Sequence, residues 1–221
     1  MTRAFVVALL GAESTGKTTL AAELATALAA RGTPAVVVPE YLREFCDTLA
    51  RTPRQDEQQG IAAEQTRRIE AAARANPGGM VIADTTALMI AVYSDQVFGD
   101  TSLYPQAEAD HARCDATLLT ALDLPWLADG LQRDGPHVRD PVDARVRAAL
   151  ARAGCGYAVV SGTGGDRLAA ALAGIDRAMN PPPTETEAAG NAPTRWHWHC
   201  ERCGDAACER HRLLPDMGDA L

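Results

Sequence analysis

Gly11-Ala12-Glu13-Ser14-Thr15-Gly16-Lys17-Thr18 stands between an apolar run, Phe5 to Leu10, and an alanine- and leucine-rich segment, Thr19 to Ala30. This order is typical of a strand, a phosphate-binding loop and a helix. The two glycines let the backbone curl so that successive N–H groups point at phosphate oxygens, and the helix adds its positive N-terminal end. The stretch therefore predicts ATP or GTP binding in an α/β fold.

Two side chains of this loop carry most of its chemistry. Lys17 supplies a charge that reaches the β- and γ-phosphates, and Thr18 offers a hydroxyl to the Mg²⁺ ion that bridges them. The alternative is a chance match in a glycine-containing turn, which would not explain the strand before the loop and the helix after it. The residues expected at the nucleotide are Gly11, Glu13, Ser14, Thr15, Gly16, Lys17, Thr18 and Thr19.

The composition narrows the classes of protein that remain. The 221 residues, 47% of them hydrophobic, predict one domain of ordinary size with a real core. A formal net charge of −8 argues against a general nucleic-acid binder, whose domain normally has a basic face. We expect no membrane span, because no run of about 18 apolar residues occurs, and no leader before the first strand. These features predict a cytoplasmic protein and leave its oligomeric state open.

Apolar runs recur along the chain and alternate with segments of helical period. Because each run is followed by a helix-like segment, we expect a five-stranded parallel sheet with helices on both faces, and we expect the second strand to be buried. The runs are Phe5 to Leu10, Ala35 to Pro39, Met80 to Asp84, Cys114 to Leu122 and Tyr157 to Ser161.

Glu40 follows the second of these strands, at the edge of the sheet where ligands of open α/β folds bind. Its carboxylate could take the proton from a substrate hydroxyl or bind sugar hydroxyls. Arg43, three residues on, could hold a phosphate or the carboxylate itself. The alternative is a solvated helix N-terminus that carries acidic residues because the helix dipole favours them.

Asp84 ends the third strand and is a second nucleotide-site signature. An acid in this place can hold Mg²⁺ directly or through water. The alternative is an N-cap for the helix that follows, although Thr85 or Thr86 could do the capping instead.

The segment from Asp123 to Gly135 has the place and composition of a lid, because it follows a strand and is rich in Asp and Gly. It contains Arg133, with Arg139 close behind, and phosphoryl transfer gains from fixed positive charge and from the exclusion of water. Trp126 is either an anchor packed on the domain or a platform for a flat cationic ring.

With these motifs assembled, the chain resembles the nicotinamide-riboside kinase domain of bacterial NAD-biosynthesis regulators, a group of P-loop kinases. The resemblance covers about residues 3 to 178. It rests on Gly11 to Leu20, Glu40-Tyr41-x-Arg43-Glu44, Ile82-Ala83-Asp84-Thr85, Asp115-x-Thr117-Leu118-Leu119 and Asp123-x-Pro125-Trp126-x-x-Asp129-Gly130.

The resemblance implies transfer of the γ-phosphoryl group of ATP to the ribose 5′-hydroxyl of nicotinamide riboside. Lys17, Glu40, Asp84 and Arg133 would be the catalytic residues, with Mg²⁺ held by Thr18 and Asp84. One position departs from the pattern: Gln132 stands where an arginine would follow Asp-Gly-Leu, and Arg133 comes next. The residues implied at the nucleoside are Glu40, Tyr41, Arg43, Trp126 and Asp129.

Two other functions stay open at this point. One is a kinase for another nucleoside or nucleotide, which the departure at Gln132 allows. The other is an ATP-binding switch in which the C-terminal tail contacts a partner and hydrolysis serves signalling.

The composition changes after residue 179, where the P-loop domain (1–179) is expected to end. A proline-rich linker spans 180–194 and a Cys/His-rich tail spans 195–221. The tail holds three cysteines and three histidines in sixteen residues, and a small segment of this kind has reason to need a metal. A disulfide or redox pair and a tail without metal are the alternatives. The residues that could close a tetrahedral Zn²⁺ site are Cys200, Cys203, Cys208 and His211.

Overall fold

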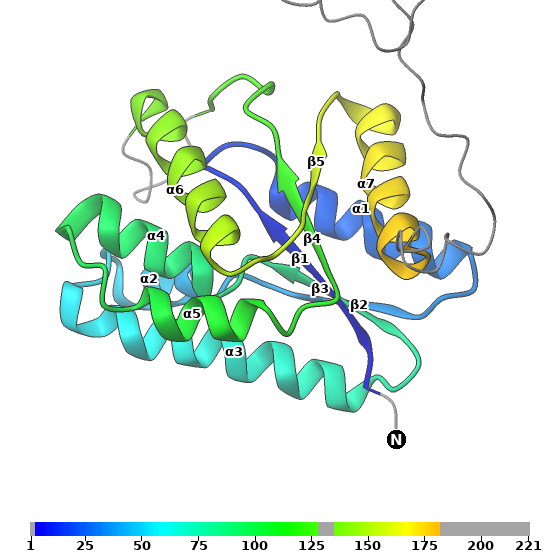
Figure 1. Ribbon diagram of the computed structural model, residues 1–221, viewed down its shortest axis with the longest axis horizontal. Coiled ribbons are helices and arrows are strands. Elements are labelled where there is room, and N and C mark those ends of the chain that lie inside the picture. The colour runs from blue at the N-terminus through cyan, green and yellow to red at the C-terminus, as the bar shows by residue number, and fades with distance from the viewer. Residues whose placement is uncertain (1–2, 128–134, 182–221) are drawn as a thin grey trace, which may run out of the picture. The chain divides into compact units, whose positions relative to one another are not determined.

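Five parallel strands form the centre of the fold, in the order β2-β3-β1-β4-β5 (Figure 1). The computed structural model describes residues 3–127 and 135–181. Within these residues the predicted α/β fold with a five-stranded parallel sheet is confirmed. The strands are β1 (Phe5–Leu10), β2 (Ala35–Val38), β3 (Met80–Asp84), β4 (Ala116–Thr120) and β5 (Ala158–Val160).

Helices cover both faces of this sheet, as the alternation of strands and helical segments predicts (Figure 1). Val7 and Leu9 of β1 pack on one side with α1 and α7, whereas Leu10 packs on the other side with α3, α4, α5 and α6. The helices are α1 (Lys17–Ala30), α2 (Tyr41–Leu49), α3 (Gln58–Ala75), α4 (Ala87–Phe98), α5 (Tyr104–His111), α6 (Arg139–Arg152) and α7 (Gly164–Met179), with short 3₁₀ turns η1 (Gln55–Glu57) and η3 (Pro136–Val138).

The expectation that the second strand is buried was wrong. Among the described residues β2 pairs with β3 alone and lies at one edge of the sheet, where Val37 is 37% exposed. A short run of β-branched residues is equally typical of an edge strand, and nothing in its own sequence separates the two cases.

In the part of the chain that the structure describes, none of the helices combines the length and the apolar character needed to cross a bilayer.

His111 is buried at the end of α5, between two threonines. Its Nδ1 lies 3.0 Å from Oγ1 of Thr86, the residue that caps α4, and its Nε2 lies 3.0 Å from Oγ1 of Thr117 in β4. Burial lowers the pKa of the imidazole from its ordinary value of 6.5 to about 4. The ring is therefore neutral in the folded protein at pH 7 and ties α5 to two neighbouring elements.

We expect this histidine to make the domain sensitive to acid. As the pH falls below about 6.5, the unfolded chain binds a proton at His111 before the folded chain does, so the stabilisation is lost progressively towards pH 4. The loss amounts to about 3 kcal/mol over this range. In denaturant unfolding at pH 7.5, 6.0 and 5.0, the free energy of unfolding should fall less with pH for His111→Gln than for the wild type. The exposed His137 offers the control His137→Gln, and equal losses in all three proteins would contradict the assignment.

Candidate active site

The predicted phosphate loop connects β1 to α1 at the carboxyl edge of the sheet. Ser14 (φ 54°) and Gly16 (φ 74°) adopt left-handed backbone conformations, which turn the chain around a concave cradle. Gly11 has φ 149°, and a Cβ at this position would lie 2.0 Å from Oγ1 of Thr120. No side chain caps the N-terminus of α1, so the positive end of this helix faces the cradle.

Thr15 braces the cradle from inside the protein. It is fully buried, its hydroxyl donates to the carbonyl of Ala12 at 2.8 Å, and its Oγ1 lies 2.7 Å from Oγ1 of Thr120 at the end of β4. The side chain of Thr15 therefore supports the shape of the loop, and its contribution to nucleotide binding would come from the backbone. Thr19, in the first turn of α1, is exposed.

Lys17 and Thr18 lie where the loop enters α1. The Nζ of Lys17 is 3.0 Å from the carbonyl oxygen of Gly11 and 2.9 Å from that of Ala12. Thr18 donates its hydroxyl to Oδ2 of Asp84 at 2.6 Å. The structure thus brings the predicted Mg²⁺ ligands together, although they are 66 residues apart in the chain.

Asp84 is positioned by the sheet, because its backbone pairs with Leu9, two residues before the phosphate loop begins at Gly11. It is 2% exposed, and its Oδ1 has no hydrogen-bond partner among the described residues. An unpartnered carboxylate oxygen beside a threonine hydroxyl is a donor set that fits Mg²⁺. The N-cap alternative is excluded, since Thr86 caps α4 by accepting from the N–H of Leu88.

Glu40 occupies the N-cap position of α2 but makes no capping hydrogen bond. Its side chain is only 16% exposed, and Nη2 of Arg43 lies 3.6 Å from its Oε2. Burial raises the pKa of the Glu40 carboxyl; the charge of Lys17 opposes this shift and that of Asp84 adds to it. Glu40, Lys17 and Asp84 are therefore close enough for their charges to act on one another. The alternative that Glu40 is a solvent-exposed acid at a helix N-terminus does not fit this burial.

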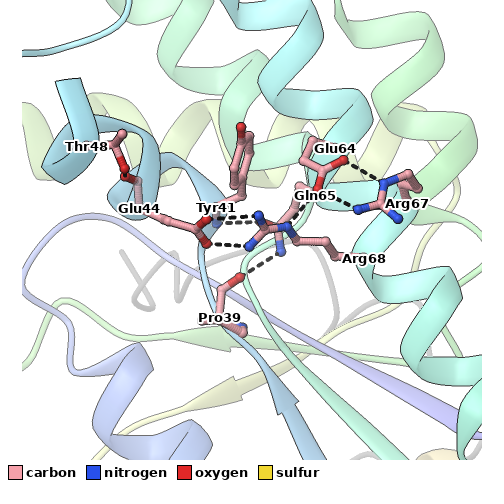
Figure 2. Close-up of polar contacts among 8 residues, drawn as sticks. All are labelled: Pro39, Tyr41, Glu44, Thr48, Glu64, Gln65, Arg67 and Arg68. Atoms are coloured by element: carbon pink, nitrogen blue, oxygen red, sulfur yellow. Dashed lines mark hydrogen bonds and ion pairs between the residues drawn. The ribbon is translucent and has the colours of Figure 1, made fainter.

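One face of the Tyr41 ring is covered by a neighbouring side chain, so a ligand could reach only the other face. The guanidinium carbon of Arg68 lies 4.3 Å from the centre of this ring, and the ring meets Phe45 edge to face at 6.4 Å between centres. Arg68 also pairs with Glu44 of α2 and Glu64 of α3 (Figure 2). The contact of Tyr41 with a substrate stays a prediction, and only the ring face away from Arg68 could make it.

The segment after β4 contacts the phosphate loop, and its role as a lid stays a prediction. The N–H of Leu127 donates to Oγ of Ser14 at 2.8 Å, and that hydroxyl is 3.3 Å from the carbonyl of Leu127. Trp126, the residue before Leu127, is half-buried. The predicted Asp129 and Arg133 lie outside the described residues.

The predicted zinc ligands Cys200, Cys203, Cys208 and His211 also lie outside the described residues, and the zinc site stays a prediction. Within 3–127 and 135–181, no group of three or more His, Cys, Asp or Glu side chains is placed to hold a metal ion. A Mg²⁺ ion on one carboxylate, one hydroxyl and phosphate oxygens needs no such group.

Two buried arginines complete the site. Arg167 of α7 donates to the carbonyl of Thr15, to Oδ1 of Asp123 at 3.2 Å and to the carbonyl of Gly162 at 3.2 Å, so it joins three loops. Sequence reasoning missed Arg167. Arg139 is 8% exposed and donates through Nη1 to the carbonyl of Leu124 at 2.9 Å, whereas its Nε and Nη2 have no hydrogen-bond partner among the described residues. It is thus a buried positive charge next to the segment that contacts the loop.

Residues 6–167 match a protein-family model described as an AAA domain. The chain belongs to the AAA domain family. This AAA domain has no match among curated proteins. The match with the family includes the phosphate loop, Glu40 and Asp84, and it ends at Arg167.

Solved structures share the fold of this AAA domain. A NadR protein in complex with NR is 21% identical, with a TM-score of 0.65 over 82% of this chain and 52% of that chain. A NadR protein in complex with NAD and AMP-PNP is 21% identical, with a TM-score of 0.63 over 82% of this chain and 51% of that chain. A thymidylate kinase from Ehrlichia chaffeensis is 18% identical, with a TM-score of 0.51 over 79% of this chain and 98% of that chain. The chain spans about half the length of the NadR chains. The P-loop NTPase fold that the motifs imply is confirmed.

Proposed function

We propose that this protein transfers the γ-phosphoryl group of ATP to the ribose 5′-hydroxyl of nicotinamide riboside, giving nicotinamide mononucleotide. The observation that carries the proposal is the position of Glu40. Its buried carboxylate is close to Lys17 and Asp84, so a group able to accept a proton stands next to groups suited to phosphate and Mg²⁺.

Each residue of the site has a task in this reaction. The cradle and the N-terminus of α1 bind the phosphates through the backbone, and Lys17 places its charge at the β- and γ-phosphates. When bound, Mg²⁺ neutralises phosphate charge, and Thr18 and Asp84 are the residues that would hold it. Glu40 accepts the proton of the attacking hydroxyl, and Arg139 supplies positive charge from the side of the Asp123 segment.

The choice of acceptor is supported by two motifs. Glu40-Tyr41-x-Arg43-Glu44 and Asp123-x-Pro125-Trp126 are the parts of the resemblance that are particular to the nicotinamide-riboside kinases. A NadR protein of the same fold has been solved in complex with NR. Trp126 would present its ring to the flat cationic nicotinamide.

A panel of acceptors tests the proposal. Steady-state ATP-dependent phosphorylation should be measured with nicotinamide riboside, uridine, cytidine, adenosine and thymidine monophosphate, with product identified by mass. We expect kcat/KM for nicotinamide riboside to exceed that for every other acceptor by about tenfold or more. The 5′-deoxy analogue of nicotinamide riboside is the matched control and should not be phosphorylated.

Two outcomes would replace the proposal. A higher kcat/KM for another nucleoside or nucleotide would reassign the acceptor, which the substitution at Gln132 makes worth testing. Slow ATP turnover that no acceptor accelerates would favour an ATP-binding switch instead of a small-molecule kinase.

A further inference from the structure

A single buried side chain of α3 joins the ends of two strands. Gln65 is fully buried. Its Oε1 accepts the N–H of Tyr41 at 2.7 Å, and its Nε2 lies 3.4 Å from the carbonyl oxygens of both Pro39 and Thr85. Figure 2 shows the side chain between Pro39 and Tyr41. One amide group thus contacts the backbone on both sides of Glu40 and directly after Asp84.

The position of this amide matters because the β2–β3 ladder ends just before it. The last pair of this ladder is Val38 and Ala83, so Glu40 lies beyond β2, whereas Asp84 is paired with Leu9 of β1 alone. The hydrogen bonds of Gln65 continue the connection between the two strands at this point. Thr85, whose carbonyl oxygen is one of the three backbone groups that Gln65 contacts, has a φ angle of 71°. A residue other than glycine keeps this left-handed conformation only when its surroundings stabilise it.

Gln65 also satisfies the start of α2. The first N–H groups of a helix have no acceptor within the helix. In α2 the acceptor for the first N–H, that of Tyr41, is Oε1 of Gln65, and Glu40 at the N-cap position makes no cap hydrogen bond. The Glu40 carboxylate therefore takes no part in capping α2.

We propose that Gln65 is a positioning residue that fixes the separation of Glu40 and Asp84 for phosphoryl transfer without touching the substrate. The inference rests on the proposed function. Glutamine suits this task because one flat group offers one acceptor and two donors. Methionine has a similar length but removes all three hydrogen bonds, whereas glutamate keeps the acceptor for Tyr41 and loses the donors to Pro39 and Thr85.

The neighbouring ion pairs do a different job. Arg68 joins α2 to α3 through Glu44 and the ring of Tyr41 (Figure 2), and its hydrogen bonds among the described residues go to Glu44 and Glu64. Its partner Glu44 is 55% exposed, and ion pairs at such positions contribute little to stability. Gln65, in contrast, has hydrogen bonds to the backbone at both strand ends.

The test compares Gln65→Met and Gln65→Glu with the wild type in the full 221-residue chain. We expect either variant to lower kcat by about 10- to 100-fold while KM for ATP changes by less than about threefold, because geometry is lost and the phosphate loop is not touched. Combined with Glu40→Gln, the loss caused by Gln65→Met should shrink to less than about threefold. The control is Thr66→Val, which removes the hydrogen bond of the next α3 residue to Asp110 at 3.1 Å and should leave kcat unchanged.

The outcomes separate this inference from the proposed function. A wild type that phosphorylates nucleosides, combined with an undiminished effect of Gln65→Met in the Glu40→Gln background, overturns the positioning role alone. A wild type that phosphorylates no nucleoside overturns the proposed function. Hydrogen exchange at the amides of Tyr41 and Thr86 then decides the positioning role: faster exchange at both in the Gln65 variants supports it, and unchanged exchange overturns it. Should Gln65→Met fail to fold, Gln65→Glu gives the same readouts.

Discussion

Replacing Lys17 with alanine should lower kcat/KM for phosphoryl transfer by at least about 1,000-fold, because the reaction loses the cation closest to the transferred group. The Nζ of Lys17 lies within 3.0 Å of two carbonyl oxygens of the phosphate loop. Transfer is measured by the acceptor assay, and nucleotide binding by calorimetry in the presence of Mg²⁺. Thermal unfolding of the variant should stay close to that of the wild type, since the side chain is partly exposed.

The matched control is Arg31→Ala, which removes a cation from the other end of α1. Arg31 lies 3.6 Å from Asp176 in an exposed ion pair, so its loss should leave transfer unchanged. A Lys17→Ala variant that kept more than about a tenth of the wild-type kcat/KM would contradict the role given to Lys17.

The sequence offers a second route to the same result. Lys17 is its only lysine, so an amine-selective acetylating reagent modifies this side chain and the N-terminal amine alone. Acetylation removes the charge without changing the backbone. We expect transfer to fall with the extent of acetylation at Lys17, and ATP with Mg²⁺ to slow the modification.

The parts of the site predicted from sequence are those set by local pattern or by strand order. The phosphate loop is a contiguous motif, and its curled backbone follows from Gly11 and Gly16. Glu40 and Asp84 were placed because each follows an apolar strand, and neighbouring parallel strands end at the same edge of a sheet. Neither inference needs to know which helix covers which face.

The residues that sequence reasoning missed act through contacts between distant parts of the chain. Arg167 reaches the carbonyl of Thr15 across 152 residues, and Thr120 reaches Thr15 across 105. Gln65 looks like any polar residue in the helical pattern of α3, and only the packing of α3 on the strand ends shows that it is fully buried. The sequence signal that could have found Gln65 was a polar residue on the apolar face of an amphipathic helix, because a buried polar side chain needs hydrogen-bond partners.

The Glu40 site has a pH dependence that follows from its surroundings. Burial, reinforced by the charge of Asp84 and opposed by that of Lys17, raises the pKa of the Glu40 carboxyl above its ordinary value of 4.5. A general base acts only when deprotonated, and the pH profile of kcat/KM reports the free enzyme, so kcat/KM should rise with pH through this raised pKa. The acid limb of the profile should therefore lie above pH 4.5 in the wild type and disappear in Glu40→Gln.

Glu40→Gln should lower kcat by about 100-fold or more and change KM for ATP by less than about threefold, because the amide cannot accept the hydroxyl proton while the phosphate loop stays intact. Asp47→Asn is the control: it removes an exposed carboxylate from the same helix and should leave kcat and its pH profile unchanged. If Glu40→Gln raised KM for the nucleoside and spared kcat, Glu40 would bind the ribose hydroxyls, and proton transfer would fall to another group. Because the substitution removes one charge from a buried cluster that includes Asp84, thermal unfolding should show no destabilisation, so a loss of rate cannot be attributed to a loss of fold.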